Sequence, residues 1–194
     1  MGTHAKISTG RRDNKFGVAI ADAPAIYWRL SRLPGLDLRG LALHIGSQLR
    51  DLAPLESAYR RTGALLADLR AAGHVIDRVD LGGGLGVSYT PDEIVPSFAE
   101  YGAMVRRVTD GWDVGLTFEP GRSIVAAAGV LLTRVIWVKP GVPRPFVIVD
   151  AAMNDLARPA MYDAYHRFAA VEPCGRTIVA NIAGPICETG DTFG

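Results

Sequence analysis

Three apolar, strand-like runs in this chain each end at a short polar or glycine-rich cluster. The clusters are residues 44–48 (His-Ile-Gly-Ser-Gln), 82–84 (Gly-Gly-Gly) and 119–122 (Glu-Pro-Gly-Arg). Polar residues that follow the carboxyl ends of successive strands are typical of the active-site edge of an α/β enzyme. We therefore expect an α/β fold with a binding site at one edge of its sheet.

Helical patterns separate these runs. Apolar residues recur at helical spacing after Asp51, which is a suitable capping residue. A second helix is predicted to start at residues 90–93 (Thr-Pro-Asp-Glu), which offer a cap, a proline and an acidic residue, although Pro96 can break or delay it. Both helices are long enough to connect neighbouring parallel strands.

The pattern changes beyond residue 128. Residues 129–139, 146–150 and 176–183 are rich in β-forming residues, and no long helical pattern separates them. The sequence therefore predicts a division into an α/β portion, residues 1–128, and the start of a mainly antiparallel β domain, residues 129–194.

The composition and net charge limit the kinds of partner that the protein is expected to bind. The 194 residues are 48% hydrophobic and carry a net charge of +1 with no run of one sign, which predicts a globular protein without a nucleic-acid or membrane partner. The two cysteines, Cys174 and Cys187, fit neither a metal-binding spacing nor a disulfide framework. We therefore expect the protein to lie in a reducing compartment, the cytoplasm, and to have no metal centre.

Each cluster taken alone has two interpretations. The glycines at 82–84 present bare amides suited to a phosphate, yet glycine also serves any tight turn. Glu119 and Arg122 suit a ligand or an ion pair at the edge of the sheet. His44 suits catalysis or a hydrogen-bonded position in the core.

Two further clusters are more specific. Residues 153–162 read Met-Asn-Asp-Leu-Ala-Arg-Pro-Ala-Met-Tyr, and residues 184–191 read Gly-Pro-Ile-Cys-Glu-Thr-Gly-Asp. Here the chain resembles the diaminopimelate decarboxylase family, group IV decarboxylases that use pyridoxal 5'-phosphate on an alanine-racemase-like fold. The likeness extends, in the family's order, to residues 7–10, 15–17, 44–48, 80–86 and 119–122.

The resemblance implies a fold and a cofactor. The fold would be the later part of a pyridoxal-phosphate-binding (β/α)8 TIM-type barrel, followed by the start of a mainly antiparallel β domain (fold type III). Glu119 resembles the carboxylate that faces the pyridine nitrogen, and His44 resembles the residue stacked on the ring. The cofactor-binding residues implied are His44, Ser47, Gly82, Gly83, Gly84, Glu119, Pro120, Gly121 and Arg122.

The resemblance also implies a substrate site. Arg122, Arg158 and Tyr162 match contacts to the retained carboxylate of meso-diaminopimelate, and Glu188 matches a contact to its distal amine. Cys187 resembles the family's proton donor, which makes it a catalytic candidate beside His44. Without the resemblance Cys187 would be read as a small buried apolar residue. The same reading is kept for Cys174, which matches no motif.

The implied reaction is the decarboxylation of meso-2,6-diaminopimelate to L-lysine and CO2 by a homodimeric parent protein. One feature departs from the family, because none of Lys6, Lys15 and Lys139 lies in the context of the lysine that carries the cofactor. The tyrosine expected beyond the cysteine motif is also absent. We therefore expect a central fragment that is inactive alone.

Two alternatives remain open from the sequence. The parent could be a related pyridoxal-phosphate-dependent decarboxylase that acts on ornithine, arginine or a carboxypolyamine. The chain could also be a non-catalytic homologue or an inert fragment, which the missing lysine favours.

Overall fold

A computed structural model describes residues 15–194, so Lys6 and the family match at residues 7–10 lie outside the described part. The chain forms two compact units. The first contains the described residues up to Ser88 together with Ile94–Ala128, and the second contains Tyr89–Glu93 and Gly129–Gly194. Residues 89–93, predicted to belong to the first portion, fold with the second unit.

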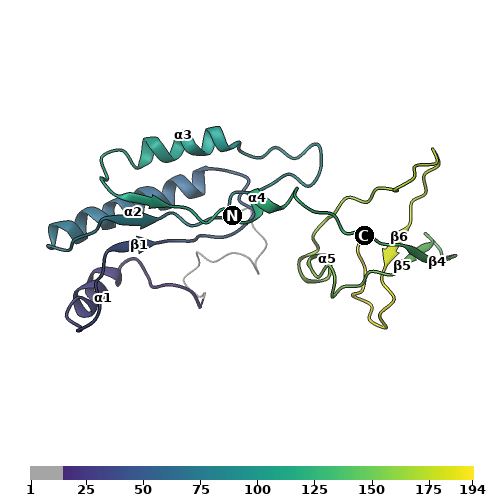
Figure 1. The fold of residues 1–194 in the computed structure, drawn as a ribbon, viewed down its shortest axis with the longest axis horizontal. Helices are drawn as coiled ribbons and strands as arrows, with labels where there is room; N and C mark the ends of the chain where they lie inside the picture. Colours follow the sequence, from purple (N-terminus) through teal and green to yellow (C-terminus); the bar gives the residue numbers. More distant parts are fainter. Residues whose placement is uncertain (1–14) are drawn as a thin grey trace. The chain divides into compact units, whose positions relative to one another are not determined.

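The first unit is built on a three-stranded parallel sheet in the order β1-β2-β3 (Figure 1). Its strands are β1 (Gly40–Ala42), β2 (Arg78–Asp80) and β3 (Gly115–Thr117). Its helices are α1 (Ala23–Leu30), α2 (Ala53–Ala71), α3 (Phe98–Val108) and α4 (Arg122–Val125). Because α2 and α3 each connect two successive parallel strands, the carboxyl ends of all three strands share one edge.

The core of this unit lies between α2, α3 and the sheet. Five of its side chains are at most 1% exposed, namely Leu55, Tyr59, Leu69, Val79 and Leu81. Each fully buried aliphatic side chain stabilises the folded state by roughly 1.5–3 kcal/mol. This packing holds the strand ends in place.

The helix starts follow local capping chemistry. The Asp51 carboxylate accepts a hydrogen bond from the Ala53 amide at 3.0 Å, but the N-cap of α2 is Leu52, so Asp51 lies one residue before the predicted capping position. Helix α3, however, begins at Phe98 and not near Thr90, because Ser97 and Glu100 form a complete capping box. Pro96 also disfavours a helical conformation at the residue before it. The predicted start at residues 90–93 was therefore wrong, and this stretch forms a turn.

The second unit contains a three-stranded sheet in the order β4-β5-β6. Its elements are β4 (Val135–Lys139), β5 (Phe146–Val149), α5 (Arg158–Tyr162) and β6 (Asn181–Ala183). The β4 and β5 strands pair antiparallel, but β5 and β6 pair parallel, so the expectation of a mainly antiparallel arrangement holds for only one of these two pairs. The long connection over residues 150–180 makes the parallel return possible.

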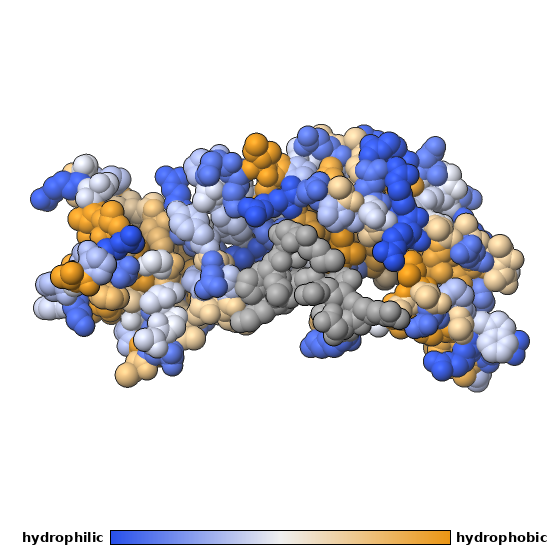
Figure 2. All heavy atoms as spheres, turned by 180° about the vertical axis from the view of Figure 1, so that it is seen from behind, coloured by the Kyte–Doolittle hydropathy of each residue, from blue (hydrophilic) through white to orange (hydrophobic). Residues whose placement is uncertain are grey.

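The second unit buries little apolar surface. Its core cluster contains Val149, Ala151 and Phe193, whereas every residue of β4 is exposed. The predicted strands at 129–139 and 176–183 shrink to 135–139 and 181–183. Figure 2 shows hydrophobic side chains among polar ones on one face of the protein.

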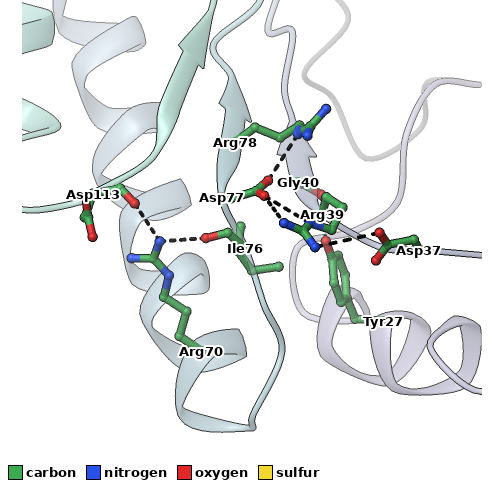
Figure 3. A network of polar contacts seen from close by, with 9 residues as sticks. All are labelled: Tyr27, Asp37, Arg39, Gly40, Arg70, Ile76, Asp77, Arg78 and Asp113. Atoms are coloured by element: carbon green, nitrogen blue, oxygen red, sulfur yellow. Dashed lines mark hydrogen bonds and ion pairs between the residues drawn. The ribbon is translucent and has the colours of Figure 1, made fainter.

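Polar contacts tie together the segments that precede the strands of the first sheet (Figure 3). Arg39, just before β1, forms an ion pair with Asp77, just before β2. The hydrogen bond from Arg39 is the main reason why the pKa of Asp77 lies below its usual value. The Arg70 guanidinium on α2 donates to the carbonyl oxygens of Ile76 at 2.6 Å, Trp112 at 2.5 Å and Asp113 at 2.9 Å. One side chain thereby connects α2 to the starts of β2 and β3.

We expect Tyr59→Phe to lower the free energy of unfolding by about 1–2 kcal/mol, as measured by urea denaturation. The fully buried Tyr59 hydroxyl donates to the Leu81 carbonyl at 3.3 Å and lies 2.9 Å from the Tyr101 hydroxyl. The exposed Tyr165→Phe is the control. Equal stabilities of the two variants would contradict the prediction.

The same variant should change the response to alkali. Burial raises the pKa of Tyr59 and of Tyr101 above the ordinary value of 10.0. A folded-state pKa above the unfolded one contributes stability below pH 10.0 that disappears as the pH rises further. The loss of stability above pH 10.0 should therefore be smaller in Tyr59→Phe than in the unmodified protein.

Candidate active site

The glycine turn lies directly after β2, where the three strand ends approach each other closely. A Cβ atom on Gly82, Gly83 or Gly84 would lie 2.2, 2.1 or 2.1 Å from a backbone carbonyl oxygen of Leu43, Glu119 or Gly46, respectively. Gly82 and Gly84 also have positive φ angles of 67° and 105°. Only glycine fits at these positions, because any side chain would push the neighbouring strand ends apart.

Two amides of this turn already have acceptors within the protein. The Gly82 N–H donates to Asp80 Oδ1 at 2.8 Å, and the Gly83 N–H donates to His44 Nδ1 at 3.3 Å. Of the two interpretations of these glycines, the close approach of backbone segments supports the tight turn. The phosphate site stays a prediction.

His44 follows β1 and is exposed, so the interpretation as a core histidine was wrong. Because Nδ1 accepts the Gly83 amide, a neutral His44 ring carries its proton on Nε2. The hydrogen bond also fixes the orientation of the ring at the carboxyl edge. A ring held in this way can offer a flat face to a ligand.

Glu119 and Arg122 follow β3 at the same edge. The Glu119 amide donates to the Gly82 carbonyl at 3.0 Å, and Glu119 is exposed. Arg122 Nη1 donates to Gln48 Oε1 at 3.3 Å, and this oxygen also accepts the Val87 amide at 3.2 Å. Gln48 therefore connects the segment after β1 to Arg122, a role that the sequence analysis did not assign to it.

The structure thus brings the predicted residues of the first unit to one edge of one sheet. The half-buried Ser47 lies in the segment after β1, and Pro120 and Gly121 lie between Glu119 and Arg122. An exposed ring, a carboxylate and a guanidinium at adjacent strand ends suit a flat, anionic ligand. These groups fit the pyridine ring and the phosphate of pyridoxal phosphate.

Arg158 is held by two aromatic residues within the second unit. Its Nη1 atom donates to the Tyr89 hydroxyl at 2.9 Å and lies 3.2 Å from His166 Nε2. The guanidinium lies 5.3 Å from the centre of the Tyr89 ring. Tyr162 ends α5, the helix that Arg158 begins, and is half-buried. Tyr89 and His166 were not predicted from the sequence, because only the fold brings them to Arg158.

Residues 185–189, which follow β6, are exposed. Cys187 and Glu188 are both exposed, and Glu188 Oε1 accepts hydrogen bonds from the Thr189 hydroxyl and the Gly190 amide, both at 3.3 Å. Cys174 is exposed as well. Interpreting either cysteine as a buried apolar residue was therefore wrong. An exposed thiol beside an exposed carboxylate is available to contact a ligand.

The sheet, with polar residues after the carboxyl ends of its strands, is typical of an α/β enzyme domain that binds its ligand at that edge. Comparison with known families identifies it more closely, because residues 1–126 match the family described as "Pyridoxal-dependent decarboxylase, pyridoxal binding domain". The chain belongs to this family. Within residues 15–194 there is no helix long and apolar enough to cross a membrane.

The most specific similarities are to diaminopimelate decarboxylases, which confirms the resemblance found in the sequence. The chain is 54% identical to the enzyme of Zymomonas mobilis over 98% of its own length and 46% of that protein, and 51% identical to that of Neisseria meningitidis serogroup A over 99% and 47%. The chain thus spans about half the length of these curated relatives.

Solved structures agree with this similarity. The diaminopimelate decarboxylase of Helicobacter pylori complexed with L-lysine matches with a TM-score of 0.93 and 38% identity, over 100% of this chain and 48% of that one. A lysine/ornithine decarboxylase of Vibrio vulnificus, at 22% identity and a TM-score of 0.83, shares the fold.

Proposed function

We propose that the chain is part of a pyridoxal-phosphate-dependent decarboxylase that converts meso-2,6-diaminopimelate to L-lysine and CO2. The observation that carries the proposal is the meeting of His44, the glycine turn, Glu119 and Arg122 at one edge of the first sheet. The identity with diaminopimelate decarboxylases over nearly the whole chain supports the choice of substrate.

The residues of the first unit would bind and polarise the cofactor. Bound pyridoxal phosphate supplies an electron sink for the electrons left on the substrate when CO2 departs. The Glu119 carboxylate would keep the pyridine nitrogen protonated, because a nearby negative charge favours the protonated form. His44 would stack on the ring. The phosphate would be bound by Ser47, by the glycine turn and by the backbone of residues 119–122.

The residues of the second unit would bind the substrate and supply a proton. Arg158 and Tyr162 would hold the carboxylate that is retained, since a guanidinium matches a carboxylate in shape and charge. Tyr89 and His166 would orient the Arg158 guanidinium. Glu188 would bind the distal amine. The Cys187 thiol would donate a proton to the carbon that loses CO2.

The parent protein would be a homodimer. Cys187 and Glu188 lie on an exposed segment after β6, which leaves both side chains available to the site of a second copy. The mass of the full-length protein in solution, measured by light scattering, tests this part of the proposal. A fully active monomer would exclude it.

The reaction is tested with the purified full-length protein supplied with pyridoxal phosphate. We expect CO2 release and formation of L-lysine from meso-diaminopimelate, and at least tenfold lower kcat/KM for ornithine and arginine, because only the first substrate presents a second carboxylate to the arginines. Preferential decarboxylation of ornithine would support the related-decarboxylase alternative. Cofactor binding without CO2 release from any of the three would support a non-catalytic homologue.

A further inference from the structure

Asp191 is the only charged residue that is buried among residues 15–194, with 2% of its surface exposed. It lies two residues after the exposed segment 185–189, at the end of the cysteine motif. Burying a carboxylate lowers the stability of the folded state unless its oxygens accept hydrogen bonds. The partners of Asp191 therefore indicate why a carboxylate is placed here.

The two carboxylate oxygens of Asp191 bind two different segments. Oδ1 accepts the Met153 amide at 2.6 Å, and Oδ2 accepts the Ile186 amide at 2.8 Å. Met153 begins the stretch that carries Arg158 and Tyr162. Ile186 directly precedes Cys187. One side chain thereby joins the two stretches of the second unit that hold the candidate substrate-binding residues.

The backbone around Asp191 closes the same turn. The Gly184 amide donates to the Asp191 carbonyl at 2.9 Å, and the Asp191 amide donates to the Glu188 carbonyl at 3.0 Å. A Cβ atom on Gly184 would lie 2.3 Å from Oδ2 and 2.6 Å from Oδ1 of Asp191. The absence of a side chain at Gly184 leaves the space that the carboxylate occupies.

We infer that Asp191 is a positioning residue for catalysis, which ties the Cys187–Glu188 segment to the Met153–Tyr162 segment without contacting the substrate. This inference rests on the proposed decarboxylase function. In the proposed homodimer, Cys187 delivers its proton and Glu188 reaches the distal amine in the site of the second copy, while Arg158 holds the carboxylate in the site of its own copy. Each site then combines Arg158 of one copy with Cys187 of the other, so the place of the Cys187–Glu188 segment on the second unit sets the geometry of both sites. Small displacements of reacting groups reduce rates steeply.

The first test compares Asp191→Asn with Asp155→Asn in the full-length protein. Asparagine keeps the shape of Asp191, but its amide group turns a donor toward one of the two backbone N–H groups. We expect a 10- to 100-fold lower kcat for meso-diaminopimelate, with cofactor binding unchanged. Asp155 is a matched control, because it is exposed on the same stretch and accepts hydrogen bonds from near neighbours, the Ala152 amide at 2.8 Å and the Asn154 side chain at 3.3 Å. It should stay within threefold of the unmodified protein.

Hydrogen exchange provides a readout that does not depend on activity. In the unmodified protein the amides of Met153 and Ile186 should exchange slowly although they lie outside helices and strands. In Asp191→Asn exchange should become faster at residues 153 and 186–190, and stay unchanged in β4 and β5. Fast exchange at both amides in the unmodified protein would overturn the inference even if the variant fails to fold.

The outcomes separate the inference from the proposed function. If the unmodified protein does not decarboxylate meso-diaminopimelate but the exchange pattern is as expected, the function fails and the tie between the segments stands. If the protein is active and Asp191→Asn has an unchanged kcat, the positioning role is wrong. Faster exchange throughout the sheet of the second unit would show a general structural role instead.

Discussion

Full-length protein with Glu119→Gln should release CO2 from meso-diaminopimelate about 10²–10³-fold more slowly, the loss typical of removing one preorganised electrostatic contact in an active site. Glutamine matches the size of glutamate but carries no charge, so it cannot keep the pyridine nitrogen protonated. The fold should be unchanged, because the Glu119 contact to the Gly82 carbonyl comes from its backbone amide. Steady-state measurement of CO2 release at saturating cofactor tests this expectation.

Asp68→Asn is the control for Glu119→Gln, since it removes one negative charge from an exposed position on α2, away from the strand ends. It should keep the activity of the unmodified protein. An active Glu119→Gln variant would remove the Glu119 carboxylate from the proposed mechanism.

The second large effect is expected for Gly83→Ala, which should lower the free energy of unfolding by about 1–3 kcal/mol or more and abolish cofactor retention. The added methyl group would lie 2.1 Å from the Glu119 carbonyl oxygen, so the segments after β2 and β3 must move apart. That movement would also separate Glu119 from His44, which accepts a hydrogen bond from the Gly83 amide. Urea denaturation and the absorbance of retained cofactor after gel filtration provide the two measurements.

Gly129→Ala is the matched control for this substitution. A Cβ atom there meets no atom within 4 Å, and the residue does not have a positive φ angle. Its stability should stay within about 0.5 kcal/mol of the unmodified protein. A Gly83→Ala variant as stable as Gly129→Ala would show that the strand ends tolerate separation.

The meeting of His44, Glu119 and Arg122 could be predicted because it follows from the order of elements. Helices between the strands make them parallel, and parallel strands place whatever follows them at one edge. The start of α3 could not be decided in this way, because Thr90 and Ser97 both offer capping chemistry. Both have a glutamate three residues later, Glu93 and Glu100, but a helix started at Thr90 would contain Pro96 in its interior, whereas no proline follows Ser97 within α3.

Individual side-chain contacts between residues far apart in the sequence could not be predicted. Tyr89 reaches Arg158 only because residues 89–93 fold with the second unit, and no local pattern near Tyr89 indicates this. Asp191 stood in a predicted motif, yet its role depends on an amide 38 positions earlier in the chain. The parallel pairing of β6 likewise depends on the path of the long connection that precedes it.

The three hydrogen bonds of Arg70 have a consequence for how such a protein can change. They secure the beginnings of β2 and β3, whereas the residues proposed to bind the ligand follow the ends of the strands. The stabilising contacts and the residues proposed to bind the ligand thus lie at opposite edges of the same sheet. Substitutions that alter substrate preference can accumulate on one rim while the anchoring of the other is preserved.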